Sequence, residues 1–315
     1  MAAIETFSLE KHYQVGFWKK RRKDALKPLT FEVREGEIFG YLGPNGAGKT
    51  TTLRLLMGLV YPSAGSARIL GCDLFDRSMK KQIGFLPEQP YFYDHLTAFE
   101  LLDYYAQLSG VDAKSRKKKV DAALARVGMA DSSRTQLRKF SKGMLQRVGI
   151  AQAIVHDPKL ILLDEPMSGL DPIGRREVRD LIQELNEGGT TIFFSTHILS
   201  DAETLCDRVA ILNKGELRGI GVVADLAREV TGNVEIAWIG ATATSGIEAL
   251  GGKTHATGNA FRAELPEAKQ DAAIDVIRRA GARLVSITPV RATLEDYFLA
   301  RLGESPVSHD AEVPR

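Results

Sequence analysis

The feature that most constrains the fold is a glycine-rich segment, GPNGAGKT, at Gly43–Thr50. It follows the short apolar run Glu37–Leu42 and precedes a helical pattern, TTLRLLMGL. Glycines let such a loop curl so that its amide groups point at phosphate oxygens, and the helix adds its positive N-terminal end. A strand, this loop and a helix in that order predict a phosphate-binding loop in an α/β domain.

The residue types in this loop suit a magnesium-bound nucleoside triphosphate. Lys49 is expected to reach the β- and γ-phosphates, and Thr50 to place its hydroxyl on Mg²⁺, with Thr51 as its neighbour. The phosphates are expected to lie along the whole loop: Gly43, Pro44, Asn45, Gly46, Ala47, Gly48, Lys49 and Thr50. A glycine turn that matches by chance is the alternative, and the flanking strand and helix disfavour it.

A second apolar run, KLILL at 159–163, ends in the two carboxylates Asp164 and Glu165. Open α/β sheets bind ligands at the carboxyl ends of their strands, so Asp164 is predicted to meet Mg²⁺ through its water shell. Glu165 is predicted to polarise the water that attacks the γ-phosphate. The alternative is a pair that only caps the turn before Pro166.

The apolar runs predict a mostly parallel sheet with helices on its faces. Leu29–Val33 and Thr190–Phe194 are further strands of this pattern, and residues 95–150 carry the spacing of a helical insertion. This α/β domain is predicted to span residues 1–225.

The texture of the sequence changes after about residue 225. A strand at Val234–Ile239, a helix at Ala272–Ala280 and a strand at Arg283–Ile287 predict a small α+β appendage over residues 226–302. The polar residues 303–315 are expected to be a disordered tail.

Composition restricts the class of protein. The 315 residues are 44% hydrophobic and carry a formal net charge of +2, too small to indicate a nucleic-acid partner. Cys72 and Cys206 lack metal-ligand spacing, which favours a reducing compartment. The start MAAIETFSLEKHY does not read as a signal peptide, and no run of about eighteen apolar residues occurs. If the chain serves transport, the pore is expected on another chain.

Three further motifs follow the glycine loop in order: LLDEP at 162–166, SGLD at 168–171 and STH at 195–197. With them, residues 5–225 resemble the nucleotide-binding subunits of ABC transporters. The resemblance implies a P-loop NTPase core with a small antiparallel β subdomain, ATP and Mg²⁺ as cofactors, and ATP hydrolysis. It also implies a homodimer or paired ATPase subunit, a separate transmembrane permease, and a peripheral place on the cytoplasmic face of the cell membrane, without nucleic acid.

The segment FSKGMLQ, Phe140–Gln146, stands where this family carries its LSGGQ signature. Ser141 and Gly143 match, and the resemblance implies that they grip the γ-phosphate held by the opposite subunit. Lys142 and Met144 depart from the pattern, and Met144 removes the side-chain contact of the usual glutamine. Simple capping of a helix by Ser141 is the alternative, and both roles can hold at once.

Three more residues take roles by resemblance. Asp171 lies in the D-loop, which communicates between subunits, although an Asp before Pro172 is equally a helix N-cap. His197 matches the switch histidine that hydrogen-bonds the γ-phosphate. Tyr13 matches the aromatic that stacks on adenine. Phe17 and Trp18 are alternatives for that stacking, as is packing of Tyr13 on the edge of a small antiparallel sheet.

The stretch LPEQPYFYDHLT, at 86–97, resembles the family's Q-loop. Gln89 is predicted to contact the nucleotide and its Mg²⁺, although Glu88 occupies the position directly after the proline and is the alternative. A plain connector is a further alternative. Residues 86–110, including the aromatic run Tyr91–Tyr93, are implied to receive the permease's coupling helix, with core packing as the alternative.

Two basic runs, Lys19–Lys23 and Lys114–Lys119, are read as solvated loops or as contacts with anionic lipid or RNA. Arg291–Leu302 resembles the end of exporter-type ATPases, against a plain amphipathic terminal helix. The predicted function is therefore ATP-driven transport, most simply export, through a separate permease. The alternatives are a non-transport ABC ATPase acting on ribosomes or DNA, and a P-loop kinase or GTPase, which leaves FSKGM and STH unexplained.

Overall fold

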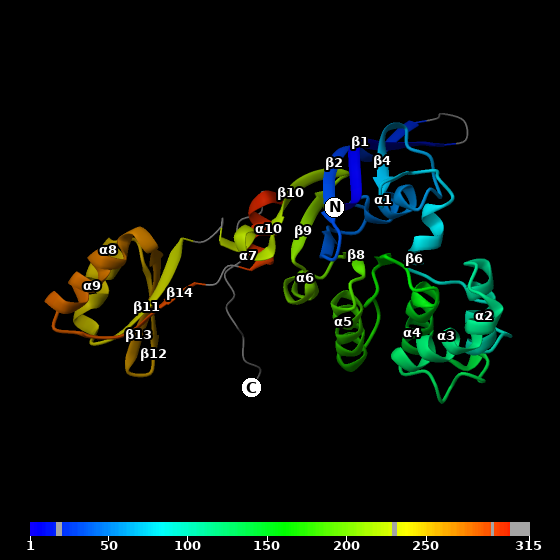
Figure 1. Cartoon of the computed structure of the whole chain (residues 1–315). Helices are drawn as coiled ribbons and strands as arrows, with labels where there is room; N and C mark the ends of the chain where they lie inside the picture. The colour runs from blue at the N-terminus through cyan, green and yellow to red at the C-terminus, as the bar shows by residue number, and fades with distance from the viewer. Residues whose placement is uncertain (17–20, 229–231, 291–292, 303–315) are drawn as a thin grey trace. The chain divides into compact units, whose positions relative to one another are not determined.

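The computed structural model describes residues 1–16, 21–228, 232–290 and 293–302 (Figure 1). The chain divides into two compact units, Met1–Val222 and Val223–Arg315, each described by itself below. Several predictions fall outside the described residues. They concern Phe17 and Trp18, the first two lysines of the basic run Lys19–Lys23 (residues 19 and 20), and the tail 303–315. None of the described helices is long and apolar enough to cross a bilayer.

A six-stranded sheet forms the centre of the first unit. Its order is β10-β9-β3-β8-β7-β6, and every strand is parallel to its neighbours except β10, which runs antiparallel to β9. The bounds are β3 Ile38–Leu42, β6 Ile83–Leu86, β7 Leu160–Asp164, β8 Thr191–Thr196, β9 Arg208–Asn213 and β10 Glu216–Val222. β3, β7 and β8 are buried along their whole length, as expected of strands covered on both faces. The predicted mostly parallel α/β sheet is confirmed.

The helices that pack on this sheet include α1 Lys49–Leu56, α5 Pro172–Glu187 and α6 Leu199–Leu205. α1 contacts β7, and α5 and α6 both contact β8. A stack of aromatic rings fills the core on one side, formed by Phe31, Phe39, Tyr41 and Phe193. Apolar packing therefore holds the strands in place. The polar residues of the site lie at the ends of the strands, outside this apolar core.

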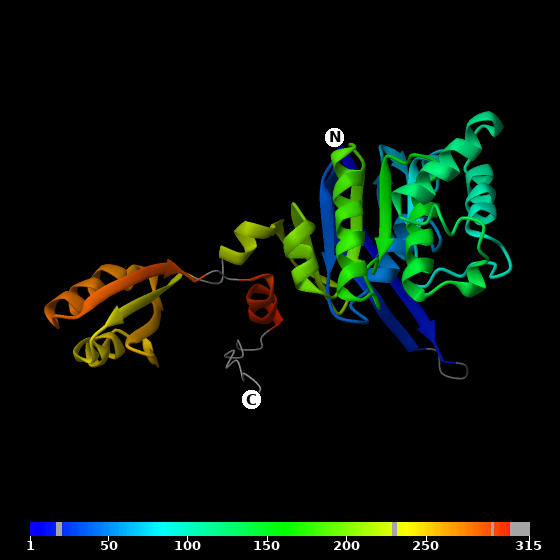
Figure 2. The same cartoon turned by 90° about the horizontal axis from the view of Figure 1, so that it is seen from below.

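A smaller antiparallel sheet, in the order β2-β1-β4-β5, confirms the predicted β subdomain. Its strands are β1 Ala2–Val15, β2 Arg21–Arg34, β4 Ala64–Ile69 and β5 Cys72–Asp73. The run predicted at Leu29–Val33 is the end of the longer β2. Beyond Glu10, β1 pairs only with β2, so the hairpin continues as a two-stranded ribbon (Figure 2). Tyr13 lies on this ribbon, opposite Lys23.

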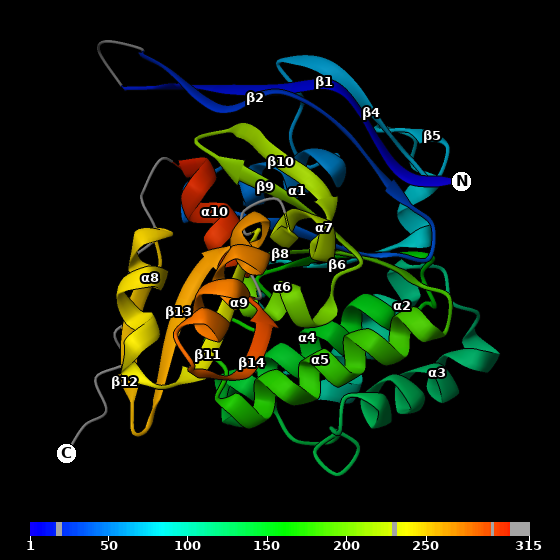
Figure 3. The same ribbon diagram turned by 90° about the vertical axis from the view of Figure 1, so that its left-hand side faces the viewer.

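The predicted helical insertion contains α2 Ala98–Leu108, α3 Ala113–Arg126 and α4 Lys142–Ile154, with short 3₁₀ turns at Met79–Gln82 before it and Leu137–Lys139 within it (Figure 3). A capping box starts α2, because Thr97 and Glu100 each accept a hydrogen bond from the other's backbone amide. The reading of Lys114–Lys119 as a loop is wrong: this run lies in α3. The acidic residue Asp112 caps α3, and cationic side chains are tolerated on its exposed face.

The second unit has the element order β11 Asn233–Ile239, α8 Thr244–Ala249, β12 Lys253–Thr257, β13 Ala260–Pro266, α9 Gln270–Arg279 and β14 Arg283–Pro289. Short 3₁₀ turns at Ala241–Ala243 and Glu267–Lys269 precede the two helices. The sheet order is β12-β13-β11-β14, with all pairs antiparallel and both helices on one face (Figure 1). This is the split βαβ, ferredoxin-like arrangement.

Two short helices flank this sheet in sequence, α7 Val223–Arg228 and α10 Leu294–Leu302, and they contact each other. Leu226, Leu294 and Tyr297 are buried. Thr293 caps α10 by accepting a hydrogen bond from the amide of Asp296, whose carboxylate accepts one from the amide of Thr293. The sequence-based boundary after residue 225 would divide α7, whereas the compact units meet before this helix.

Candidate functional site

The polar residues of the site gather at one edge of the parallel sheet. β3, β7 and β8 are adjacent and parallel, with Leu42 opposite Thr196 and Asp164 opposite Ser195. The glycine loop follows β3, Glu165 follows β7 and His197 follows β8. Three segments that are far apart in sequence therefore meet at the carboxyl ends of the strands, where open α/β sheets bind ligands.

The glycine loop depends on its glycines at particular positions. Gly46 and Gly48 have φ of +80° and +112°, a region that other residues adopt at a cost. A Cβ on Gly43 would overlap the carbonyl oxygen of Leu212, and one on Gly48 would lie 2.6 Å from that of Ala25. The loop therefore passes too close to its neighbours for side chains, and α1 begins directly after it at Lys49.

The glycine loop itself positions the side chain of Lys49. Its side chain is 6% exposed, and its Nζ donates a 2.6 Å hydrogen bond to the carbonyl oxygen of Gly43. The same Nζ lies 3.2 Å from Oε1 of Glu165. The ammonium therefore lies between the phosphate-binding loop and the carboxylate after β7, as a basic group for a phosphate requires.

Asp164 is the most enclosed acid of the site, 1% exposed. Ser195 Oγ donates a 2.6 Å hydrogen bond to Asp164 Oδ1, and the Thr50 hydroxyl is a second donor. Burial raises the pKa of Asp164 most, and the negative charges of Glu88 and Glu165 raise it further, while the two hydroxyls act in the opposite direction. A nearby cation would therefore favour the ionised form of this carboxylate.

Glu165 has an unusual backbone, with φ of +51° at a non-glycine residue. Its amide donates to Ser195 Oγ at 3.1 Å, which anchors this turn to β8. Its carboxylate lies between two partners, because Oε2 is 2.9 Å from Nδ1 of His197 and Oε1 faces Lys49. A left-handed non-glycine residue costs of order 1 kcal/mol, and such strain clusters at functional sites.

Ser195 and Gln146 have structural roles in the site that the sequence motifs containing them do not predict. Ser195 binds both Asp164 and the amide of Glu165. Gln146 is buried and its Nε2 donates a 2.8 Å hydrogen bond to the carbonyl oxygen of Pro166. Gln146 therefore ties α4, the helix of the signature segment, to the loop after β7. The position of Ser195 two residues before His197 was the available signal, but only tertiary contact reveals its partners.

The signature segment and the D-loop form a separate surface. Ser141 caps α4, accepting a hydrogen bond from the Met144 amide at 3.3 Å. Asp171 caps α5 in the same way through the Gly174 amide at 3.2 Å. Both capping alternatives therefore describe real contacts. The two segments line a cavity of about 380 Å³ with these residues: Ser141, Lys142, Gly143, Arg147, Gly169, Leu170, Asp171, Ile173, Gly174 and Glu177. None of them belongs to the glycine loop.

The remaining predicted residues have less defined contacts. Gln89 Oε1 accepts a 3.4 Å hydrogen bond from the Tyr91 hydroxyl, whereas the charge of Glu88 acts on Asp164. Lys11 Nζ lies 5.0 Å from the centre of the Tyr13 ring, on the β1–β2 ribbon. Thr51 lies in the first turn of α1, beside Thr50.

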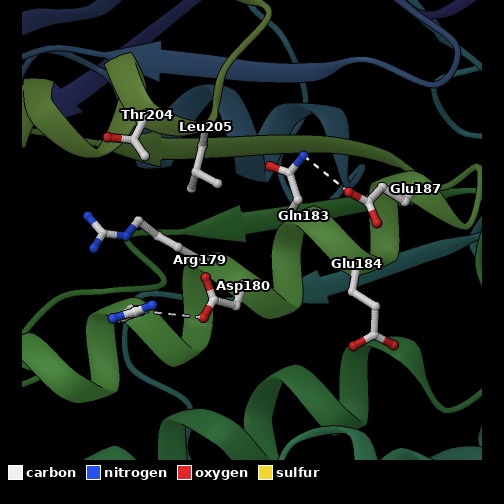
Figure 4. Close-up of a pocket in the computed structure, with 8 residues that line it drawn as sticks. Arg179, Asp180, Gln183, Glu184, Glu187, Thr204 and Leu205 are labelled. Carbon is white, nitrogen blue, oxygen red and sulfur yellow. Dashed lines mark hydrogen bonds and ion pairs between the residues drawn. The ribbon is translucent and has the colours of Figure 1, made fainter.

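A larger cavity, about 570 Å³, lies between α5 and α6 (Figure 4). Its walls are mostly charged, with the Arg176–Asp180 pair at 3.9 Å and a Gln183–Glu187 hydrogen bond at 3.4 Å. It contains none of the predicted site residues. Cavity size therefore does not locate the chemistry in this unit, and the convergence of strand ends does.

A phosphate-binding loop after β3, a carboxylate pair after β7 and a histidine after β8 define a P-loop nucleoside triphosphatase. A family model described as ABC transporter matches residues 26–168. The chain is 44% identical over 320 residues to an uncharacterized ABC transporter ATP-binding protein of Synechocystis sp., covering 97% of this chain and 86% of that protein. The bacitracin transport ATP-binding protein BcrA of Bacillus licheniformis is 45% identical over 196 residues, covering 61% of this chain and 63% of BcrA.

Solved structures agree with this assignment. The structure of an ATP-binding subunit of an ABC transporter superposes with a TM-score of 0.63 at 32% identity, over 72% of this chain and 92% of that one. A dimeric post-hydrolysis state of the ATP-binding cassette MJ0796, bound to ADP and Pi, gives a TM-score of 0.64 at 26% identity, over 70% and 98%. The chain belongs to the ABC transporter ATP-binding proteins. It is an ATPase that binds ATP and powers an ABC transporter.

Proposed function

We propose that two copies of the chain enclose ATP, each nucleotide lying between the glycine loop of one copy and the signature segment of the other. The observation that carries this proposal is that the cavity lined by Ser141, Gly143 and Asp171 contains no residue of the glycine loop. One copy thus presents two separate phosphate-facing surfaces. A second copy related by twofold symmetry would pair each surface with its complement.

Within one copy, the contacts and the family resemblance support the following roles. Lys49 and the loop amides bind the β- and γ-phosphates, because they are the positive groups beside the strand ends. Glu165 orients the attacking water and accepts its proton. His197 lies 2.9 Å from Glu165, so it holds that carboxylate in place and reaches the γ-phosphate from the exposed side. Tyr13 stacks on the adenine ring.

The donor set at Thr50 and Asp164 suits Mg²⁺. A hydroxyl and a carboxylate are hard oxygen ligands, and Asp164 is a desolvated acid whose ionised form a cation would stabilise. Bound Mg²⁺ would neutralise charge on the β- and γ-phosphates. Glu88 is better placed than Gln89 to face this position, because its charge acts on Asp164 while Gln89 bonds to Tyr91.

The partner on the membrane side is a separate permease, and the chain is a peripheral subunit on the cytoplasmic face. Tyr91 is 88% exposed and Tyr93 is also exposed, beside the loop that carries Glu88. Exposed aromatic side chains are typical anchors of protein interfaces. They would couple movement of this loop to the permease. Relatives named for bacitracin transport and linearmycin resistance favour export over import.

The variant Glu165→Gln tests this function. Removing the base is expected to lower turnover by about 1,000-fold while ATP binding persists, so that the protein accumulates as an ATP-bound dimer. Turnover is measured by phosphate release and the dimer by light scattering with size-exclusion chromatography. Glu187→Gln, an exposed acid on α5, is the matched control. Normal turnover in the Glu165 variant, or a monomer at saturating ATP and Mg²⁺, would contradict the proposal.

A further inference from the structure

Lys142 is the residue at which the signature segment departs from the glycine of the family pattern, and its side chain has a definite place. It lies across the D-loop turn, since a Cβ on Gly169 would overlap Lys142 Nζ and lie 2.8 Å from Cε. Gly169 has φ of +69°, so this turn already requires glycine. The lysine therefore spans from the start of α4 to the D-loop.

Lys142 is one of the residues that line the cavity of about 380 Å³ described above. In the described ranges of the chain, Lys142 has no hydrogen bond or ion pair, while the acids of this cavity have partners. Glu177 lies 3.3 Å from Arg147, and Asp171 accepts from the Gly174 amide. The cavity thus holds one cation whose charge no neighbour offsets, next to the neutral donors Ser141 and Gly143.

We propose that Lys142 is a specificity-determining residue that binds the triphosphate of the facing subunit and favours ATP over ADP in closing the dimer. This inference rests on the proposed function. Ser141 and the start of α4 offer only dipoles and neutral donors, whereas an ammonium in a closed, water-poor interface interacts strongly with a phosphate. ATP carries the additional γ-phosphate for this cation, and ADP does not.

The competing explanation is that Lys142 only spaces the signature segment from the D-loop through its aliphatic chain. The two explanations differ in what Lys142→Met and Lys142→Arg would do. Methionine keeps an unbranched chain but removes the charge, while arginine keeps the charge. A phosphate contact also depends on salt, because ions screen the attraction, whereas packing of the chain does not.

The experiment measures ATP-dependent dimerisation in the Glu165→Gln protein, with Lys142→Met, Lys142→Arg or Lys139→Met added, over a series of salt concentrations. Lys139 is exposed, lies three residues away and does not line the cavity, so it controls for loss of surface charge. We expect Lys142→Met to raise the ATP concentration for half-maximal dimerisation about tenfold and to reduce its salt dependence. For Lys142→Arg this ATP concentration should stay near that of the parent, and for Lys139→Met it should equal that of the parent.

Binding of a fluorescent ATP analogue to dilute, monomeric protein should be unchanged in all variants, because the glycine loop is intact. The ratio of ATP to ADP needed for dimerisation should rise with Lys142→Met, because this variant lacks the charge that favours ATP. Equal dimerisation and salt dependence in Lys142→Met and the parent would overturn the inference while leaving the proposed function standing. An equal loss at every salt concentration that arginine does not restore would show a spacer and overturn it too. A parent that never dimerises with ATP would refute the proposed function itself.

Discussion

The first unit has two surfaces that we propose to contact phosphate, and they differ in how far their polar groups are paired within the chain. At the carboxyl edge of the sheet, Lys49, Asp164 and Glu165 are almost wholly buried and joined to their neighbours by hydrogen bonds or ion pairs. At the signature surface, Ser141, Lys142 and Asp171 are exposed around an open cavity. A buried charge must be compensated within its own chain, while an exposed one can await a ligand or a second copy.

The largest expected effect is at the buried surface. Lys49→Ala removes the only group whose ammonium contacts both Gly43 and Glu165 in the described part of the chain, and leaves that acid buried beside a phosphate. We expect ATP affinity to fall by about 100-fold, measured by isothermal titration calorimetry. Lys139→Ala is the control. If the ATP affinity of Lys49→Ala were unchanged, the buried surface would not be the principal phosphate site, and the signature surface would have to take that role.

A second effect concerns pH. Because burial raises the pKa of Asp164 above its ordinary 3.8, the folded chain holds this proton more tightly than the unfolded chain. Its contribution to the free energy of unfolding therefore falls as pH rises from 3.8 through the folded pKa. Asp164→Asn cannot ionise, and its amide oxygen can still accept from Ser195. We expect this variant to abolish hydrolysis yet melt at a higher temperature than the parent at pH 7.

Thermal melts between pH 4 and pH 8 measure this difference, which should shrink as pH falls toward 4. Asp180→Asn, an exposed acid on α5, controls for loss of a negative charge. A variant that is less stable than the parent at pH 7 but equal to it at pH 4 would show that the ionised carboxylate stabilises the fold. The buried surface would then be organised for stability rather than for a cation.

The smallest effect separates two roles at the exposed surface. Asp171→Ala removes the cap of α5 and should lower the free energy of unfolding by about 1 kcal/mol, whereas Asp171→Asn retains a capping oxygen. Urea unfolding measures the cap, and ATP-dependent dimerisation of the Glu165→Gln protein measures the subunit contact. If both variants lose dimerisation equally, the charge of Asp171 acts between subunits. If only alanine does, Asp171 acts as a cap.

Much of the buried site could be predicted because local sequence encodes it. The glycine loop must contain glycine wherever a Cβ would meet backbone, as at Gly43, so its pattern is visible in the sequence. The acidic pair after KLILL and the histidine after β8 follow from strand ends, which lie on one edge in any parallel sheet. The family resemblance supplied the roles of Ser141, Asp171 and Tyr13, which the residues alone left open.

Fewer elements of the second unit could be predicted from the sequence. β11, α9 and β14 were predicted, whereas β12, β13 and α8 were not. β12 is largely exposed and reads KTHAT, and α8 has only six residues, so neither presents a long apolar period. Elements of this kind are stabilised by their partners in the sheet and not by their own pattern.

By itself the sequence determined that this chain builds a phosphate-binding loop, a parallel sheet and a carboxylate pair at a strand end. Backbone sterics require glycine at particular positions of the loop, and buried strands require apolar runs, so both are visible as local sequence patterns. Only the tertiary structure decided which atoms meet: Ser195 beneath Asp164, His197 against Glu165, Glu88 acting on Asp164, and Lys142 lying over Gly169. These contacts join residues from separate strands and loops, and their geometry depends on how the elements pack, which no local pattern records.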